Sequence, residues 1–145
     1  MSDLAKKLGL KPGQVVHLHS APPDAAALVK QESPEGVTFT EKLGRGRYDL
    51  ILWWPKKLAT LGEHFVRHQR FIKPDGAVWV VMPKKAYARE RGIDFTWEQM
   101  QAAGLRTDMV DNKVASVTET DYGTRWVIRK ERREKHAAGQ RMGSG

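Results

Sequence analysis

Two continuous apolar runs dominate the pattern of hydrophobic and polar positions. The first extends from Tyr48 to Trp54 and the second from Ala77 to Met82, and both are rich in β-branched and aromatic residues. Strands that are buried on both faces of a sheet have this composition, because the helices of crossover connections cover both sides. Each run is followed at once by a proline, Pro55 or Pro83. The pattern therefore predicts two central strands of a parallel sheet.

Helices are predicted between and around these strands, over residues 4–8, 25–31, 56–72 and 96–104. In the segment 56–72 the apolar residues Leu58, Leu61, Phe65 and Ile72 fall on one helical face. Gly9 follows the first segment and Gly104 closes the last one, as glycine C-caps do. Thr96 and Gln99 have the spacing of a capping box, which places the start of the last helix.

Four further strands are predicted over residues 14–20, 37–43, 105–120 and 124–130. Lys73-Pro74-Asp75-Gly76 is predicted to turn the chain into the second apolar run, with Gly76 free to adopt positive φ. Gly123 is predicted to turn the last two strands into an antiparallel hairpin at the sheet edge. The order β-α-β-β-α-β-α-β-β predicts an α/β fold, a three-layer Rossmann-like sandwich with a mostly parallel sheet and an antiparallel C-terminal hairpin.

The same turn and strand carry a resemblance to known families. Lys73 to Gly76 before an apolar strand, followed by a helix and a terminal hairpin, is similar to the second half of class I S-adenosylmethionine-dependent methyltransferases. Short motifs also resemble DUF3052, a bacterial family of domains of unknown function: Leu8-Gly9-Leu10-Lys11-Pro12-Gly13, Leu52-Trp53-Trp54, Pro83-Lys84-Lys85 and Gly123-Thr124-Arg125. The resemblance covers most of residues 4 to 130. It implies the fold and supplies no activity.

The length and net charge of the chain indicate its domain organisation and the kind of partner to expect. A chain of 145 residues suits one domain, predicted over residues 1–130, followed by a basic, disordered tail over residues 131–145. The chain carries 25 Lys and Arg against 17 Asp and Glu, a net charge of +8. Such a field attracts anions, so the expected partner is an anionic ligand, a nucleic acid or an acidic protein.

Several classes of protein are excluded or disfavoured by what the sequence lacks. It has no cysteine, which excludes disulfides, thiolate metal sites and thiol nucleophiles. No apolar run approaches the roughly 18 residues that a membrane span needs, and the N-terminus lacks the apolar core of a secretory signal. The expected location is the cytoplasm. No nucleophile elbow, P-loop or zinc-protease motif occurs.

The exit of the first strand, Ser20-Ala21-Pro22-Pro23-Asp24, decides which cofactor is plausible. A dinucleotide needs a glycine-rich turn here, whereas two prolines lack the N–H donor and Asp24 adds a negative charge. S-adenosylmethionine carries no phosphate and is less strongly disfavoured. Glu41 lies about 20 residues beyond the first strand, where related folds place a ribose-binding acid. The alternative is that Glu41 is an ordinary surface charge.

Three strand exits are expected to meet at one edge of the sheet. Besides Ser20, these are Trp53-Trp54-Pro55-Lys56-Lys57 and Met82-Pro83-Lys84-Lys85. Aromatic faces beside cations suit an anionic ligand with a planar group, including an unpaired base. Candidate cofactor residues are Ser20, Glu41, Trp53 and Trp54; candidate anion-binding residues are Lys56, Lys57, Lys84 and Lys85. The alternative is that the tryptophans are core residues and the lysines only keep the strand ends soluble.

The histidines form two pairs, each with the spacing of metal ligands. His17 and His19 share one strand face, and His64 and His68 share one helix face. Nothing in the sequence brings the two pairs together, so surface or core histidines are favoured and no metal site is predicted.

The interpretation that follows is a single-domain binding module without a functional cofactor loop and with an anionic partner. One alternative is a divergent methyltransferase that uses Ser20, Glu41 and the Trp53-Trp54 edge for S-adenosylmethionine. Another is an RNA- or DNA-binding protein that uses the lysine edge and the basic tail.

Overall fold

A six-stranded sheet forms the centre of the computed structural model, which describes residues 2–44 and 46–143 of the chain, with side chains up to residue 140. The strands are β1 (Val15–His19), β2 (Thr38–Thr40), β3 (Tyr48–Trp53), β4 (Ile72–Pro83), β5 (Met109–Ser116) and β6 (Asp121–Ile128). Their order across the sheet is β2-β1-β3-β4-β6-β5. The first four strands are parallel, and the β5-β6 hairpin is antiparallel. The predicted fold class is confirmed.

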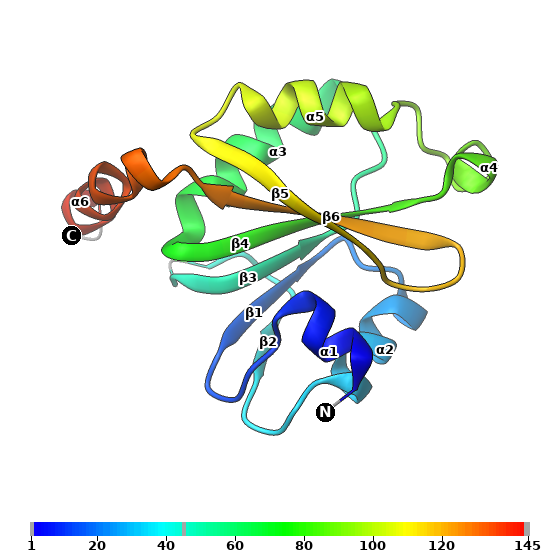
Figure 1. Cartoon of the computed structure of the whole chain (residues 1–145), viewed down its shortest axis with the longest axis horizontal. Coiled ribbons are helices and arrows are strands. Elements are labelled where there is room, and N and C mark those ends of the chain that lie inside the picture. Colours follow the sequence, from blue (N-terminus) through cyan, green and yellow to red (C-terminus); the bar gives the residue numbers. More distant parts are fainter. Residues whose placement is uncertain (1, 45, 144–145) are drawn as a thin grey trace.

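Helices cover both faces of this sheet and give the fold its three layers. They are α1 (Asp3–Leu8), α2 (Pro23–Glu32), α3 (Leu58–Phe71), α4 (Lys85–Ala88), α5 (Trp97–Leu105) and α6 (Arg133–Gly143), with the 3-10 helix η1 (Lys130–Arg132) before α6. Figure 1 shows α3 and α5 on one face and α1 and α2 on the other. The short helix α4 lies where β4 ends, and α6 lies at the opposite end of the strands (Figure 1). None of the helices within the described ranges is long and apolar enough to cross a membrane.

The predicted helix caps are confirmed at two positions. Gly9 ends α1 with a φ of 78°, and its N–H bonds back to the Ala5 and Lys6 carbonyls. At α5, Thr96 accepts a hydrogen bond from the Gln99 N–H, while the Gln99 side chain accepts one from the Thr96 N–H. Both caps are formed by residues within a few positions of each other in the chain, so the local sequence is enough to predict them.

Strand β4 is buried on both faces, as its apolar run predicts. Every residue from Ala77 to Pro83 is buried. Trp79 faces α1, and its Nε1 donates to the Leu8 carbonyl oxygen at 3.1 Å. The neighbouring Val78 and Val80 face the opposite way and pack in the core beneath α3 and α5. The strand therefore joins two hydrophobic cores.

Two glycines that were predicted to end or turn elements instead make room for tryptophan rings. Gly104 lies inside α5, where a Cβ would overlap the Trp126 ring. Gly123 lies inside β6, where a Cβ would be 2.8 Å from Cε3 of Trp79. The hairpin turn lies earlier, in the residues just before Asp121, whose carbonyl accepts the Val117 and Thr118 N–H groups. The positional predictions for both glycines were wrong.

Gly76 also differs from its predicted role. It does not have positive φ, and its backbone passes the Tyr48 and Asp49 carbonyl oxygens so closely that a Cβ would be 3.0 Å from each. The segment before it forms an irregularity within β4, where the pairing with β3 shifts register. Lys73 Nζ lies 2.9 Å from Asp49 Oδ1, and Asp49 Oδ2 accepts the Val15 N–H at 2.8 Å. Asp49 thereby holds the amino ends of three strands together.

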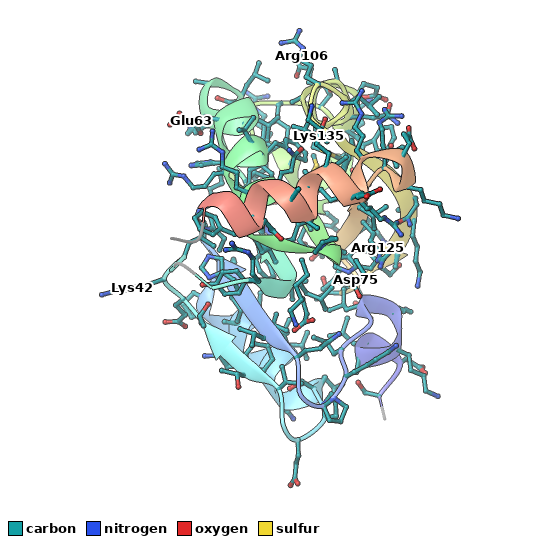
Figure 2. The ribbon with its side chains drawn as sticks, turned by 90° about the vertical axis from the view of Figure 1, so that its left-hand side faces the viewer. Lys42, Glu63, Asp75, Arg106, Arg125 and Lys135 are labelled. Atoms are coloured by element: carbon teal, nitrogen blue, oxygen red, sulfur yellow. The ribbon has the colours of Figure 1, made fainter. Side chains whose placement is uncertain are left out.

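The segment expected to be a disordered tail contains η1 and α6 as far as residue 143, and residues 144–145 lie outside the described part. Gln140 Nε2 donates to the Ile72 carbonyl oxygen at 2.6 Å, and His136 Nε2 bonds to the same oxygen at 2.9 Å. Arg47 Nη2 donates to the Gln140 carbonyl oxygen at 2.7 Å. Figure 2 shows α6 crossing in front of the sheet, with Lys135 on it. The helix thus covers the amino edge rather than the carboxyl edge.

Because the Trp126 ring lies against Gly104, any larger residue at position 104 is expected to destabilise the protein. Gly104→Ala should lower the free energy of unfolding by about 2 kcal/mol, since the added methyl group must displace a buried ring. Urea denaturation measures the effect. Gly62→Ala is the matched control, because Gly62 lies in α3 and a Cβ added there would have no neighbour within 4 Å. That variant should gain roughly 0.5–1 kcal/mol from helix propensity. Equal stabilities of the two variants would contradict this account.

Candidate functional site

The order of the chain reverses between β1 and β3. The chain passes from β1 outward to β2 and then returns to β3 on the other side of β1. At the carboxyl ends His19 pairs with Trp53, and the Trp54 N–H donates to the His19 carbonyl oxygen at 3.1 Å. Open α/β sheets bind ligands in the crevice outside such a switch point. The candidate site is therefore the carboxyl edge of β1 and β3.

Ser20 lies at this point and has an unusual backbone. Its φ is 58°, and among the described residues no other non-glycine residue has positive φ. Left-handed backbone at a serine costs on the order of 1 kcal/mol, and such strain concentrates at functional sites. Ser20 is also exposed to solvent. The sharp turn that a glycine usually provides is made here by a residue with a hydroxyl group.

The start of α2 offers little to a phosphate. Its N-cap is Pro22, which makes no side-chain cap, and Pro23 occupies the first turn without an N–H. Asp24 adds a carboxylate to the same turn. Anion binding at a helix N-terminus needs free N–H groups and a favourable dipole, and the carboxylate opposes the dipole's effect on an anion. The turn favours a neutral or cationic group.

A cavity of about 560 Å³ opens beside this turn, on the face of the sheet that α2 covers. All three strand exits contribute to it, through Pro22, the Trp54-Pro55 pair and Pro83. Trp54 is only 6% exposed and belongs to the core beneath α1 and α2, so the cavity has a rigid apolar wall. The expected meeting of the three exits is found in the structure. A volume of this size suits a small molecule.

The polar side of the cavity comes from residues that the sequence did not suggest. Arg91 Nη1 lies 3.2 Å from Asp121 Oδ1, and Arg91 Nη2 donates to Thr120 Oγ1 at 3.0 Å. Thr120 Oγ1 also donates to Asp121 Oδ1 at 2.7 Å. Arg91 follows α4, while Thr120 and Asp121 belong to the hairpin turn, so only the folded sheet brings them together. The paired charges give the cavity a fixed arrangement of donors and acceptors.

One of the four candidate lysines contributes to the lining of this cavity. Lys56 lines it, and Lys57 follows as the exposed N-cap of α3. Lys84 and Lys85 are exposed at the start of α4, where the Lys84 N–H donates to the Thr120 carbonyl oxygen at 2.7 Å. The carboxyl edge thus carries positive charge around an apolar interior.

The two adjacent tryptophans lie on opposite faces, because side chains alternate along a strand. Trp54 lines the cavity, whereas Trp53 is 1% exposed and packs beneath α3, with its ring centroid 4.9 Å from that of Phe65. Trp53 therefore contacts the core and not the cavity.

Glu41 directly follows β2 at the same carboxyl edge, next to the end of β1. Its side chain is 70% exposed, and its Oε1 lies 3.5 Å from Lys30 Nζ. It does not line the cavity. Its position allows contact only with a ligand that extends along the edge past the end of β1.

The structure brings the two histidine pairs together, which sequence spacing did not predict. Helix α3 packs over β1 so that the His19 ring centroid lies 4.6 Å from that of His68 and 5.6 Å from that of His64. Burial, together with weaker repulsion from the other histidines of the cluster and from Arg67, lowers the pKa of His68 to about 2 and that of His19 to about 4. These imidazoles are neutral at pH 7.

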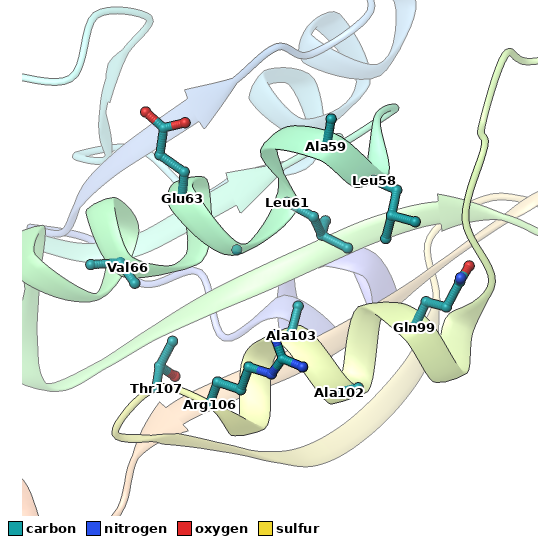
Figure 3. A pocket seen from close by; sticks show the side chains of 11 residues that line it. Leu58, Ala59, Leu61, Glu63, Val66, Gln99, Ala102, Ala103, Arg106 and Thr107 are labelled. Atoms are coloured by element: carbon teal, nitrogen blue, oxygen red, sulfur yellow. The ribbon is translucent and has the colours of Figure 1, made fainter.

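A second hollow, of about 570 Å³, lies between α3 and α5 (Figure 3). Leu58 and Val66 of α3 face it from one side, and Ala102 of α5 with Arg106, the C-cap of that helix, from the other. It is remote from the strand exits, and no residue of the sheet is among those that line it within the described part of the chain. The carboxyl-edge cavity remains the better candidate.

Comparison with solved structures identifies proteins that share this fold. An N-methyltransferase, NodS from Bradyrhizobium japonicum, matches with a TM-score of 0.59 and 10% identity over 88% of this chain and 93% of that chain. A putative type 11 methyltransferase from Sulfolobus solfataricus matches with a TM-score of 0.56 and 14% identity, over 88% and 90%. A TehB-like S-adenosylmethionine-dependent methyltransferase from Corynebacterium glutamicum gives 0.53 and 9%, over 87% of each chain. The chain has the Rossmann-like methyltransferase fold.

Neither a family model nor a curated protein matches the sequence. The resemblance to DUF3052 therefore stays a prediction, and the low identities to the solved structures show the fold alone. A second structure of NodS, with a TM-score of 0.58, is of its complex with S-adenosyl-L-homocysteine. The ligand of the present chain has to be argued from its own residues.

Stability should fall in mild acid because of the buried histidines. A histidine whose pKa is lowered on folding stabilises the fold fully above its unfolded pKa of about 6.5, and the contribution is lost as the pH falls towards the folded value. For His68, which is fully buried, the loss at pH 5 is about 2 kcal/mol. Urea unfolding at pH 7.5, 6 and 5 in the presence of EDTA measures it.

Two variants isolate the contribution of His68. In His68→Leu the pH dependence between 7.5 and 5 should be visibly shallower, because no imidazole must remain neutral there. Val66→Ala, which shortens an exposed, non-titrating side chain of the same helix, is the control and should keep the wild-type slope. If His68→Leu and the wild type lost stability in parallel, burial of this imidazole would not be the cause.

Proposed function

We propose that the chain binds S-adenosylmethionine at its carboxyl edge and is a divergent S-adenosylmethionine-dependent methyltransferase. The observation that carries the proposal is the cavity of about 560 Å³ beside the β1–β3 switch point. The methyltransferase fold, shared with enzymes over nearly their whole length, supports it. The sequence, whose first strand exits without a glycine-rich turn, had favoured a binding module without a functional cofactor loop, and the fold comparison now favours the methyltransferase alternative.

The residues at the switch point fit the chemistry of this cofactor better than that of a nucleotide phosphate. S-adenosylmethionine presents a sulfonium and an ammonium group, and Asp24 places a carboxylate in the turn that would face them. Ser20 offers a hydroxyl in an exposed, strained turn. Glu41 offers carboxylate oxygens that can accept hydrogen bonds from ribose hydroxyls. These three residues, with Trp54, would hold the cofactor.

The side of the cavity formed by Arg91, Thr120 and Asp121 then serves the methyl acceptor, while the side at Asp24 faces the cofactor. When bound, the cofactor supplies an activated methyl group, and the main task of the protein is to hold the two reactants in line. The Arg91–Asp121 pair gives the acceptor a polar anchor, and Trp54 with Val81 gives it an apolar wall. An acceptor with one anionic or hydroxyl group and a planar or aliphatic body fits this lining.

Calorimetric titration of the purified chain with S-adenosylmethionine and S-adenosylhomocysteine tests the proposal. We expect micromolar binding of both, and a loss of at least about tenfold in Glu41→Ala, since a hydrogen bond to a charged acceptor contributes about 1.5–3 kcal/mol. Glu35→Ala is the matched control. Glu35 is an acid before β2, at the other end of the strand, and its removal changes the net charge equally.

The proposal is wrong if the wild-type chain binds neither S-adenosylmethionine nor S-adenosylhomocysteine. Equal losses in the Glu41→Ala and Glu35→Ala variants would leave cofactor binding intact but remove Glu41 from the site.

A second candidate function is binding of an anionic ligand, nucleic acid included, through the lysines of the carboxyl edge. The observation that favours it is that Lys56 lines the cavity while Lys57, Lys84 and Lys85 are exposed where β3 and β4 end. Cations beside an aromatic wall suit an unpaired base and its phosphate. This candidate needs no cofactor.

Anisotropy of a labelled single-stranded RNA tests the lysine edge. Affinity should fall steeply with salt, and the double variant Lys84→Ala/Lys85→Ala should weaken binding about tenfold and reduce the salt slope by about two, one for each lost phosphate contact. Lys6→Ala/Lys11→Ala, a pair of exposed lysines at the amino side, is the control and should bind as the wild type does. Equal losses in both double variants would mean that net charge alone attracts RNA.

A further inference from the structure

Four of the five histidines form one cluster on the α3 face of the sheet. His17 and His19 come from β1, and His64 and His68 come from α3. The ring centroids of His64 and His68 are 6.1 Å apart, and those of His17 and His19 are 5.2 Å apart. The fifth histidine, His136, lies on α6 at the amino edge. His136 therefore lies outside the cluster and can serve as a control histidine in mutagenesis.

His68 is buried without any group to satisfy its ring. It is 0% exposed, and neither of its ring nitrogens has a hydrogen-bond partner among the described residues. Trp53 and Phe65 provide an apolar surrounding, with the Trp53 ring centroid 4.8 Å from that of His68. A buried polar atom without a partner is costly, and native structures that contain one usually satisfy it with a water or an ion. The described part of the protein supplies no such partner itself.

We propose that His17, His19, His64 and His68 form a binding site for a divalent transition metal ion of the zinc, nickel or cobalt type. Neutral imidazole is the ligand that these ions share, and the cluster contains no thiolate or carboxylate that would suit softer or harder ions. Three or four nitrogens would bind the ion. A water molecule can complete the coordination at His64, which is only partly buried.

One distance in the cluster fits two histidines that bind the same metal ion. His17 Nε2 and His19 Nδ1 are 3.0 Å apart, close to the roughly 3.3 Å that separates two imidazole nitrogens on one tetrahedral zinc ion. His68 and His64 then lie across from this pair, close to the ring of His19. Among the described residues, no group of three or more His, Cys, Asp or Glu side chains is placed to hold a metal ion in their present orientations. Binding therefore includes a rotation of the α3 imidazoles towards the β1 pair.

Residues around the cluster are suited to hold the ligands in place. Thr40 Oγ1 lies 3.0 Å from His17 Nδ1, which leaves Nε2 of that ring directed at His19. Ligating histidines usually have such a partner on the other nitrogen, because it fixes the ring and its tautomer. Tyr48, with its ring 5.5 Å from that of His17, and Trp53 close the apolar shell. The site and its support thus come from three strands and one helix.

The proposal does not depend on the proposed cofactor function. The histidines lie on the α3 face, whereas the carboxyl-edge cavity lies on the α2 face of the same sheet. Either site can fail its test while the other passes.

The test uses untagged full-length protein that has been stripped with EDTA and returned to chelator-free buffer at pH 7.5. Titration with Zn²⁺ against a chromogenic chelator measures affinity, and Co²⁺ absorbance reports the ligand field. We expect one ion per chain, submicromolar Zn²⁺ affinity, and visible Co²⁺ bands of a low-symmetry nitrogen site. His68→Leu and His19→Gln should each weaken Zn²⁺ binding by more than roughly 100-fold. Thr40→Val should weaken it by about 10- to 100-fold.

His136→Ala is the matched control and should bind Zn²⁺ within about twofold of the wild type, since it lies outside the cluster. Circular dichroism of each variant in EDTA checks that it is folded; His68→Leu should fold well, because it removes two unpartnered polar atoms. The proposal is wrong if the wild type binds no ion at one equivalent, or if His136→Ala weakens binding as much as His68→Leu does. It is also wrong if folded His68→Leu retains the wild-type affinity.

Discussion

Burial of β4 on both faces is the constraint on which the rest of the structure depends. Trp79 on one face needs α1 above it and the glycine at position 123 beside it, and its indole N–H needs the Leu8 carbonyl oxygen. On the other face Val78 and Val80 need α3 and α5, and α5 approaches closely only because Gly104 leaves room for Trp126. Helices α1 and α5 are thus each positioned by a tryptophan side chain of the sheet. The central strand thus determines the order of the layers as well as the stability of the core.

A sheet held in this way offers a rigid carboxyl edge on which function depends on a few loop residues. The β1–β3 switch point is set by topology, but the groups that meet there are Ser20, two prolines and Asp24 rather than a glycine loop. The fold is therefore shared with methyltransferases while the turn departs from the usual nucleotide-binding chemistry. The proposed cofactor, which is cationic and carries no phosphate, is consistent with both facts, and the cavity beside Trp54 lies next to the proposed site.

What the sequence predicted well are features that one strand or one helix end determines. The β4 run, the Gly9 cap and the Thr96–Gln99 box depend on neighbours in the chain, and all three were predicted correctly. The glycines at 104 and 123 were misassigned, because their role is to accommodate rings that come from distant strands.

The candidate site was predictable only in part for the same reason. Proline and lysine patterns located the three strand exits. The Arg91–Asp121 pair and the four-histidine cluster arise only when a hairpin turn and α3 pack against the sheet. Helix α6 was missed because its charged sequence resembles a solvated tail, and its hydrogen bonds to Ile72 depend on where β4 begins.

The central claim is that the ligand site lies at the carboxyl edge of β1 and β3. Amide NMR spectra of the labelled chain, recorded as S-adenosylhomocysteine is added, test this directly. The account predicts saturable shifts concentrated at Ser20, Glu41 and Trp54, with the α6 amides unchanged. Shifts confined to the α3–α5 groove, or spectra that do not change at millimolar ligand, would contradict it.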